Sequence, residues 1–523
     1  MRLSKTISLL SNASMEEDNQ ESKIDSKLQN RQKNFNNEVD FEYMKEKNMT
    51  QELSSSQNNR TKILSQRRLK QNLKQEITES LATKISIDKE WYEYCNKLEI
   101  NLSKFTEVIS AFRSQDLKQK FLGLTGLRKL LVLKNAPIQE IIDEGVVPEI
   151  ISLLDNSPPE FQYESLWCLT NIATGTISQV NYIVSKGCIP RLMKCLESPI
   201  EELKIQSVWV IGNIVTDSYK YREIFIKDKI FDKILVTLAS TNNKSVIKQF
   251  TYSVHCFFKV YPIPEFSQVE KSIKIIARVL LLLPDDKEFL EDALPILSFM
   301  TDNYNQSIAF LIELNLISHI INFLNSNYET IQLFCLKIIG NIASGNANQT
   351  QLLIDNNILN YLAKTIFSKN KKIVKETSWI ISNIAAGTKK QIQTLISMGF
   401  LKILSEINQK EEEEIKNECL WAICNLTSVE DKNFMQILLD QGILEIICNF
   451  LKNNDAKKLG VCIEALCNLL EYGKEQDPNP IAIQIEKLGM CDIIENLQNH
   501  PVDYVYEKVF KMMIKYFKVE YVV

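Results

Sequence analysis

The segments WCLTNIATG (residues 167–175), WVIGNIVTD (residues 209–217) and WIISNIAAG (residues 379–387) decide the fold. In each of them an asparagine stands four positions after a tryptophan, and NECLWAICNLTS contains a fourth such pair. The four pairs are Trp167/Asn171, Trp209/Asn213, Trp379/Asn383 and Trp421/Asn425. Positions i and i+4 lie on the same face of a helix, one turn apart. The pairs therefore predict a ladder of indoles and carboxamides on a binding surface, rather than core aromatics with helix-capping amides.

The pairs recur with a regular period. Asn171 and Asn213 are 42 residues apart, as are Asn383 and Asn425. Steps of 42 or 43 residues connect Asn213 with Cys256, Phe299, Asn341 and Asn383, and Asn425 with Asn468. One structural unit per period is the signature of a repeat protein, in which each repeat packs only on its neighbours.

Short apolar segments with helical spacing also recur once per period, such as IPRLMKCL, ISHIINFL and LEIICNFL. A glycine or asparagine usually precedes them, which suits the left-handed turn that ends one helix before the next. Strand signals are absent. We therefore expect an all-α, right-handed superhelical solenoid of about ten armadillo repeats, with the tryptophans on the inner helices that line a concave groove.

The first 95 residues have a different composition from the rest of the chain. They contain no glycine and no proline, few apolar residues and many polar and charged ones. We expect residues 1–95 to form a flexible, weakly basic segment. Armadillo repeats 1–9 should follow over residues 96–475, and residues 476–523 should form a C-terminal capping repeat.

Composition argues against several function classes. The net charge of −4 provides no overall positive field for nucleic acid. Three histidines and no CxxC pair disfavour a metal site and His-based catalysis, so we expect no cofactor and no enzyme. The twelve cysteines are expected to be reduced core residues. No apolar run approaches the ~20 residues of a membrane span, so no membrane insertion is expected.

The chain resembles the importin α family of nuclear import adaptors. The resemblance rests on NAPIQEIIDEGVVPEIISLL, FQYESLWCLTNIATGT, QSVWVIGNI, GNIASGNANQTQ, VKETSWIISNIAAGTKKQIQ and NECLWAICNLTS, which occur in family order. It covers residues 104–523. It implies an adaptor of cytoplasm and nucleus that binds Lys/Arg-rich nuclear localisation signals of cargo proteins. It also implies importin β as carrier and an export receptor at the C-terminal repeats.

The resemblance assigns two cargo sites, and the chemistry of their residues agrees with it. The major site comprises Trp167, Asn171, Gly175, Gln206, Trp209, Asn213 and Asp217. The minor site comprises Asn341, Gly345, Thr350, Trp379, Asn383, Glu418, Trp421 and Asn425. Indoles attract the stem and ammonium of lysine, carboxamides can hold a peptide backbone, and Asp217 would pair with a cargo lysine.

Several positions depart from the family pattern. Tyr252 and Cys256 replace a Trp/Asn pair, Phe299 replaces a tyrosine, and Val180 replaces a hydroxyl residue. Pro295 replaces a tryptophan, and a proline inside a helix costs about 3 kcal/mol, so that helix is expected to begin late or kink. Lys259 and Lys337 stand where the family has groove arginines that separate the two sites. We therefore expect the major site to be weakened and the minor site to carry an unusually large share of binding.

The N-terminal segment matches the family least well. The candidates for an importin β contact are Arg31, Arg60, Lys62, Arg67, Arg68 and Lys70. The dense arginine cluster that the family has here is replaced by YMKEKNMTQELSSSQNN. The basic stretch at residues 60–74 could contact importin β, mimic cargo internally or merely confer solubility. Two functions remain open: an import adaptor, or an armadillo scaffold that binds basic peptides but has lost importin-β-dependent transport.

Overall fold

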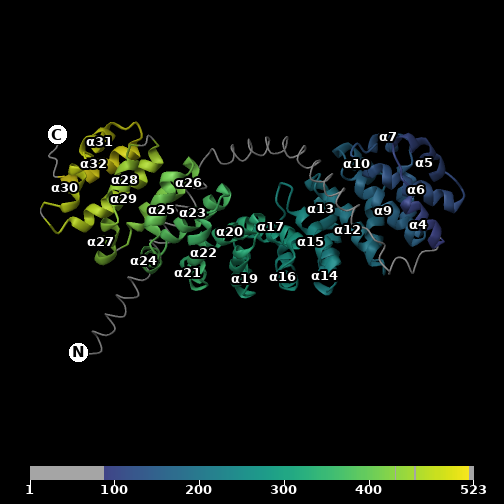
Figure 1. Cartoon of the computed structure of the whole chain (residues 1–523), viewed down its shortest axis with the longest axis horizontal. Coiled ribbons are helices and arrows are strands. Elements are labelled where there is room, and N and C mark those ends of the chain that lie inside the picture. Colours follow the sequence, from purple (N-terminus) through teal and green to yellow (C-terminus); the bar gives the residue numbers. More distant parts are fainter. Residues whose placement is uncertain (1–87, 430, 453–454, 477, 518–523) are drawn as a thin grey trace, which may run out of the picture. The chain divides into compact units, whose positions relative to one another are not determined.

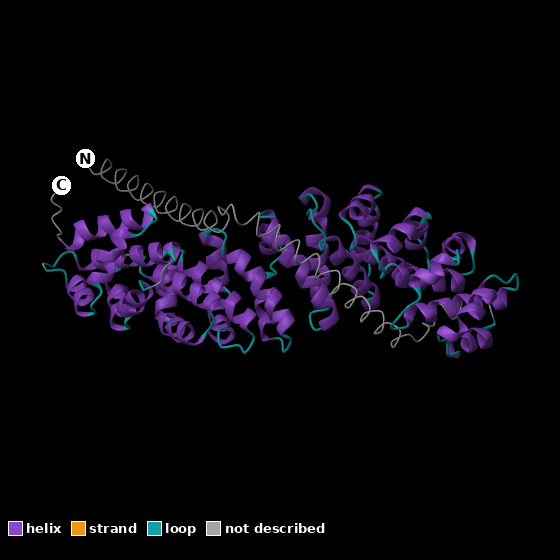
Figure 2. Ribbon diagram, turned by 90° about the horizontal axis from the view of Figure 1, so that it is seen from above, coloured by secondary structure: helices purple, strands orange, loops and turns teal. Residues whose placement is uncertain are grey.

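The computed structural model describes residues 88–517 apart from residues 430, 453–454 and 477. Within these ranges every regular element is a helix (Figure 2), so the all-α prediction is confirmed for the described chain. The importin β candidates and most of the segment expected to be flexible lie outside the described residues.

The chain divides into two compact units, and each is described by itself. The N-terminal unit comprises the described residues up to Leu314, and the C-terminal unit comprises those from Asn315 onward. The helices of the two units group into ten successive repeats.

In the N-terminal unit, long helices at intervals of one repeat pack on one another. They are α6 (Leu117–Val132), α9 (Pro159–Ile172), α12 (Glu201–Val215), α15 (Lys244–Phe257) and α17 (Lys287–Asn303). The shorter helices between them are α4 (Lys89–Lys97), η1 (Leu102–Lys104), α5 (Phe105–Phe112), α7 (Ile138–Asp143), α8 (Val147–Asn156), α10 (Ile177–Ser185), α11 (Cys188–Leu196), α13 (Tyr219–Lys227), α14 (Ile230–Ser240), α16 (Phe266–Leu282) and α18 (Gln306–Glu313). Figure 1 shows the long helices following one another along this unit.

The C-terminal unit repeats the same plan. Its long helices are α20 (Glu329–Ala343), α23 (Lys371–Ala385), α26 (Glu413–Leu426), α29 (Ala456–Gly473) and α32 (Asp503–Phe517). The others are α19 (Ile317–Asn322), η2 (Phe323–Asn325), α21 (Ala347–Asp355), α22 (Ile358–Thr365), α24 (Lys389–Ser397), α25 (Phe400–Lys410), α27 (Lys432–Asp440), α28 (Ile443–Phe450), α30 (Pro480–Lys487), α31 (Cys491–Asn496) and η3 (Leu497–Asn499).

Local sequence signals set the helix boundaries. Gly187, Gly399 and Gly442 adopt left-handed backbone angles directly before α11, α25 and α28, as the glycine pattern predicted. A capping box starts α10, α21 and α24, in which a Thr or Asn side chain and a Gln three residues later bond reciprocally to the backbone. These signals turn the chain between helices, and burial of the apolar faces then stacks the repeats.

Two expectations about helix boundaries are wrong. Of the two alternatives for the helix that contains Pro295, a kink stays a prediction and a late start is wrong, because α17 starts at Lys287 and Pro295 is buried in its interior. Its neighbours Leu294 and Ile296 are fully buried, so core packing outweighs the local cost of the proline. Residues 88–95 were expected to be flexible, but most of them belong to α4, because Tyr92 is buried and stacks on Phe121 of α6 at 5.5 Å.

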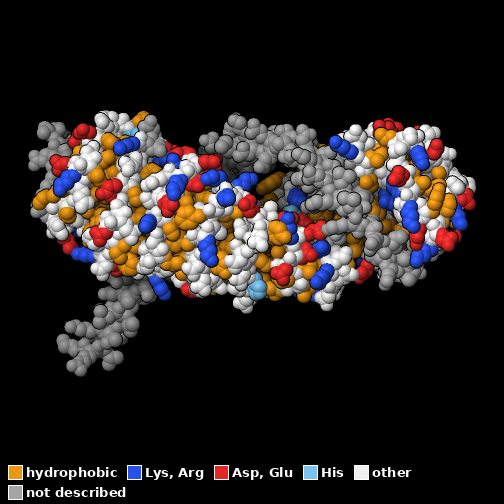
Figure 3. Space-filling model, in the orientation of Figure 1, with side chains coloured by type: hydrophobic (Ala, Val, Ile, Leu, Met, Phe, Trp, Pro, Cys, Tyr) orange, Lys and Arg blue, Asp and Glu red, His pale blue; other side chains and the backbone are white. Residues whose placement is uncertain are grey.

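The remaining bulk features are simple. All twelve cysteines are free, and ten are buried. On the face seen in Figure 3, acidic and basic side chains are interspersed over the described surface. No single described helix is long and apolar enough to cross a membrane; only the bent pair Gln306–Glu313 and Ile317–Asn325 passes that test together.

Candidate functional site

The Trp/Asn ladder lies on the long helices of four repeats. Trp167/Asn171 and Trp209/Asn213 stand on α9 and α12, which pack together in the N-terminal unit. Trp379/Asn383 and Trp421/Asn425 stand on α23 and α26, which pack together in the C-terminal unit. Within each unit the fold therefore places two Trp/Asn pairs on neighbouring helices.

The first pair of the ladder has buried polar atoms that no group in the described part of the chain satisfies. Trp167 is 4% exposed and Asn171 is 1% exposed. Among the residues that the structure describes, the indole Nε1 of Trp167 and both amide atoms of Asn171 have no hydrogen-bond partner, and neither do Nε1 of Trp209 and Nδ2 of Asn383. Buried side-chain polar atoms are usually hydrogen-bonded, so these atoms are suited to a ligand backbone that would bond them.

Other ladder amides also link neighbouring repeats. Asn213 Nδ2 donates to the carbonyl oxygen of Thr170 at 3.1 Å, and Asn425 Nδ2 donates to the carbonyl oxygen of Ser382 at 3.2 Å. Each acceptor directly precedes the asparagine of the repeat before. Gln206 strengthens the first junction, because its amide donates to the Thr170 hydroxyl at 2.9 Å. These bonds hold the ladder amides at a defined spacing.

The amide oxygen of Asn213 also has a partner within the described part of the protein, in contrast to that of Asn171. The Tyr252 hydroxyl on α15 donates to Asn213 Oδ1 at 3.1 Å. Tyr252 stands one period after Trp209, and an indole at that position has no hydroxyl with which to make this bond. Asn213 therefore bonds within the protein through both its donor and its acceptor.

A glycine makes room for one of the ladder indoles. Gly340 on α20 directly precedes Asn341, and a Cβ atom at Gly340 would lie 2.0 Å from Cζ3 of Trp379. Gly212 precedes Asn213 in the same way, but a Cβ there would meet Tyr252 and Cys256 at an ordinary 3.4 Å. This role of Gly340 was not predicted from the sequence, and the residue pair Gly-Asn does not signal it, because the glycine of the same pair in WVIGNI faces Tyr252 and Cys256 rather than an indole.

Acidic side chains lie close to the ladder in both units. Asp217 is half-buried, and burial together with the charge of Asp217 raises the pKa of Tyr221. Glu418 is half-buried on α26, and its Oε2 lies 3.3 Å from the hydroxyl of Ser382 on α23. Each unit therefore carries indoles, amides and at least one carboxylate on its ladder helices or directly after them.

Comparisons with known proteins agree with the armadillo-repeat fold. The armadillo/β-catenin-like repeat family matches residues 134–174, 177–216 and 388–428, and the atypical Arm repeat family matches residues 479–522. Importin subunit alpha-3 of Arabidopsis thaliana is 30% identical over 260 residues, covering 49% of this chain and 48% of that protein. Importin subunit alpha-1b of Oryza sativa subsp. japonica is 32% identical over 260 residues, with the same coverages.

Over about half of its length the chain is similar to importin α subunits, and it contains armadillo repeats. Importin subunit alpha-B of Dictyostelium discoideum is a further relative, 29% identical over 325 residues that cover 61% of this chain and 60% of that protein. The chain spans about half the length of the first curated relatives it matches. An engineered protein of known structure matches 80% of this chain and all of its own, with 19% identity and a TM-score of 0.67, which shows the fold alone.

Three residues that the importin α pattern assigns to cargo sites make contacts inside their own repeats. The buried Thr350 hydroxyl donates to the carbonyl oxygens of Ala343 and Asn346, both at 3.2 Å. A Cβ atom at Gly175 or Gly345 would lie 2.1 or 1.9 Å from the side-chain oxygen of the glutamine in the following capping box. The Thr350 hydroxyl therefore helps to hold the turn after α20. Gly175 and Gly345 leave room for the capping-box glutamine that follows each of them.

The departures from the importin α pattern cluster in the N-terminal unit. Cys256 is fully buried, and Lys259 Nζ lies over the Tyr252 ring, 5.5 Å from its centroid. Phe299 packs on Phe258 at 5.2 Å, and Val180 is fully buried. In the C-terminal unit, Lys337 Nζ lies over the Phe334 ring, 5.8 Å from its centroid.

One polar contact of the N-terminal unit was not predicted from the sequence. The Nδ1 atom of His255 on α15 lies 2.9 Å from Oδ1 of Asp292 on α17.

Proposed function

We propose that this protein is a nuclear import adaptor of cytoplasm and nucleus. It binds Lys/Arg-rich nuclear localisation signals of cargo proteins along the Trp/Asn ladder and links them to an importin β carrier. The observation that supports this most is the buried, unpartnered amide of Asn171 beside the Trp167 indole. An extended peptide has the N–H and C=O groups that such an amide needs.

The chemistry of the ladder favours a basic peptide over other extended peptides. Indole faces attract a lysine or arginine cation, and they also pack against its apolar stem. The carboxylates of Asp217 and Glu418 add a charge that an ammonium can pair with. Backbone contacts by the asparagines require no particular side chain, so cargoes of many sequences can share one register.

The two units are not expected to contribute equally. Asn213 has both amide groups bonded within the protein, and Cys256 has no amide to offer. In the C-terminal unit the pairs Trp379/Asn383 and Trp421/Asn425 are intact on consecutive repeats, whereas the repeat after Asn213 has Tyr252 and Cys256 in place of such a pair. A lost hydrogen bond is worth about 1 kcal/mol net, so the minor site should carry the larger share of binding.

Reversing the charge of Asp217 tests the proposal. Asp217→Lys places a cation where the cargo lysine should pair, and a hydrogen bond to a charged group is worth about 1.5–3 kcal/mol. We expect the affinity of the N-terminal unit for a fluorescent basic peptide to fall about tenfold or more. Fluorescence anisotropy measures this affinity. Both the variant and the parent protein carry Trp421→Ala, which weakens the minor site so that the N-terminal unit contributes most of the binding.

The matched control is Asp228→Lys, which makes the same charge change at an exposed position at the end of α13. It should alter the affinity only through the weak, salt-screened field of the whole protein. Equal affinities for the Asp217 and Asp228 variants would remove Asp217 from its proposed role. Absence of binding by the unsubstituted protein would refute the peptide-binding function itself.

The link to importin β distinguishes the adaptor from the scaffold alternative. Deletion of residues 1–87 leaves intact α4, which begins at Lys89 and packs on α6 through Tyr92. We expect the full chain to capture importin β in a pull-down, and the deleted chain to lose this capture while it still binds peptide. A full chain that binds basic peptides but no importin β would favour the scaffold.

We further propose an export receptor as partner of the C-terminal repeats.

A further inference from the structure

One tryptophan of the ladder already has a cation from its own chain on its ring. The guanidinium carbon of Arg128 on α6 lies over Trp167, 4.4 Å from the ring centroid. Among the described residues, no lysine or arginine takes such a position over Trp209, Trp379 or Trp421. A cation at this distance occupies an indole face that would otherwise attract a peptide cation.

Buried contacts hold Arg128 in this position. Its Nε donates to Oε2 of Glu164 at 2.5 Å, and its Nη2 donates to Oδ1 of Asn96 at 2.8 Å. The side chains of Arg128 and Glu164 are only 9% and 1% exposed. Glu164 stands three positions before Trp167 on α9, so the same helix face presents the carboxylate and the indole. Separating a buried pair of this kind would leave a charge uncompensated, and this cost holds Arg128 beside Glu164 and over Trp167.

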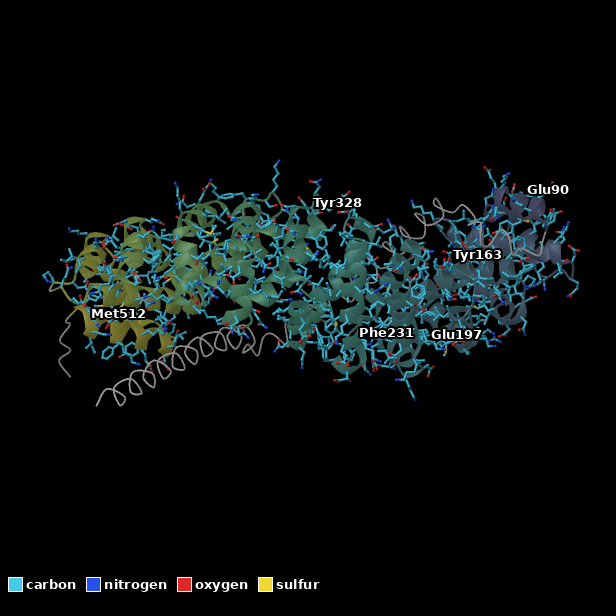
Figure 4. All side chains as sticks on the ribbon, turned by 90° about the horizontal axis from the view of Figure 1, so that it is seen from below. Glu90, Tyr163, Glu197, Phe231, Tyr328 and Met512 are labelled. Carbon is cyan, nitrogen blue, oxygen red and sulfur yellow. The ribbon has the colours of Figure 1, made fainter. Side chains whose placement is uncertain are left out.

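The surroundings of Trp167 reinforce this arrangement. Tyr163, from the same helix and labelled in Figure 4, meets the Trp167 ring edge-on at a centroid distance of 5.8 Å. In the repeat that follows Trp209/Asn213, Lys259 lies over the Tyr252 ring. Cations of the protein itself therefore stand on the aromatic rings of the repeats that flank Trp209.

We propose that Arg128 ends the ladder of the N-terminal unit by taking the place of a cargo cation on Trp167. This inference rests on the proposed binding of basic peptides. It specifies the ligand of this unit as a short cluster of basic residues, because the Trp209 indole is the only ladder indole of the unit without a resident cation among the described residues. An additional lysine at the α6 end of the peptide then finds the Trp167 face that Arg128 covers already occupied.

The test measures how affinity depends on the number of lysines. The probes are fluorescent peptides with two, three or four consecutive lysines and Gly/Ser flanks of constant total length. The full chain carries Trp379→Ala and Trp421→Ala, so that the N-terminal unit dominates binding. With Arg128 present, affinity should reach a plateau as lysines are added. In Arg128→Met, affinity should continue to rise for one more lysine before it reaches the plateau. The longest peptide should bind this variant at least about threefold more tightly than the protein with Arg128.

Two controls separate this effect from a general loss of charge or stability. Arg128→Lys keeps a cation beside Glu164 and should preserve the plateau. Arg222→Met removes another buried arginine, which pairs with Glu223 and donates to the carbonyl oxygen of Val260 but does not lie over a ladder indole, and should also preserve it. The double variant Arg128→Leu/Glu164→Leu replaces the buried pair by apolar side chains and should shift the plateau as Arg128→Met does, even if the single variant does not fold.

The outcomes are distinguishable from those of the proposed function. If the protein with Arg128 binds lysine peptides and neither Arg128→Met nor the double variant changes the dependence on lysine number, Arg128 does not end the ladder. If Arg128→Lys shifts the plateau as Arg128→Met does, the arginine acts by shape and not as a cation, and the inference is also wrong. If the protein binds no lysine peptide at all, the proposed function fails first.

Discussion

Glu164→Ala should lower the free energy of unfolding of the N-terminal unit by about 3–5 kcal/mol, because it leaves the guanidinium of Arg128 buried without its carboxylate. Removing one partner of a buried ion pair costs far more than the net value of the pair, since the remaining charge stays out of water. The measurement is the midpoint of the first transition in chemical unfolding, followed by circular dichroism. Hydrogen exchange of α6 and α9 locates the loss.

The control for this prediction is Glu149→Ala. Glu149 also pairs with a residue of α6, Lys120, at 2.7 Å, but its side chain is 40% exposed. Such surface pairs contribute about 0–1 kcal/mol, so the midpoint should hardly move. Similar shifts for the two alanine variants would show that the Arg128–Glu164 pair is not held as the structure describes.

Gly340→Ala should displace the Trp379 indole and so weaken basic-peptide binding in the C-terminal unit about tenfold. The new Cβ atom would lie 2.0 Å from Cζ3 of Trp379, and two carbon atoms cannot approach so closely. The ring must leave its position or the two helices must move apart, and either change disrupts the site. Peptide affinity is measured in a Trp209→Ala background, which weakens the site of the N-terminal unit.

Gly212→Ala is the matched control, because Gly212 occupies the same place before a ladder asparagine. Its added Cβ would meet its neighbours at 3.4 Å, an ordinary contact. Alanine is also favoured over glycine inside a helix by about 1 kcal/mol, so this variant should fold at least as well. Measured in a Trp421→Ala background, it should leave affinity within about twofold of its parent. If Gly340→Ala also leaves affinity unchanged, the Trp379 ring does not depend on the glycine.

Much of the fold and the position of the ladder could be predicted from the sequence. The alternation of apolar segments with Gly187, Gly399 and Gly442 is a local signal, and local signals determine where helices begin and end. The i, i+4 spacing of Trp167 and Asn171 likewise requires only one helix to place both side chains on one face. Pro295 misled the prediction, because its local cost is outweighed by core packing that the segment alone does not show.

The sequence by itself determined an all-α repeat array with indoles and amides on its long helices, because a period of 42 or 43 residues and helical spacing are visible along the chain. Only the tertiary structure decided which of these groups already have partners. The Tyr252 bond to Asn213 and the Arg128–Glu164 pair over Trp167 join residues 39 and 36 positions apart, on helices of adjacent repeats. Such contacts depend on how neighbouring helices pack and which rotamers fit between them, and no local pattern specifies that.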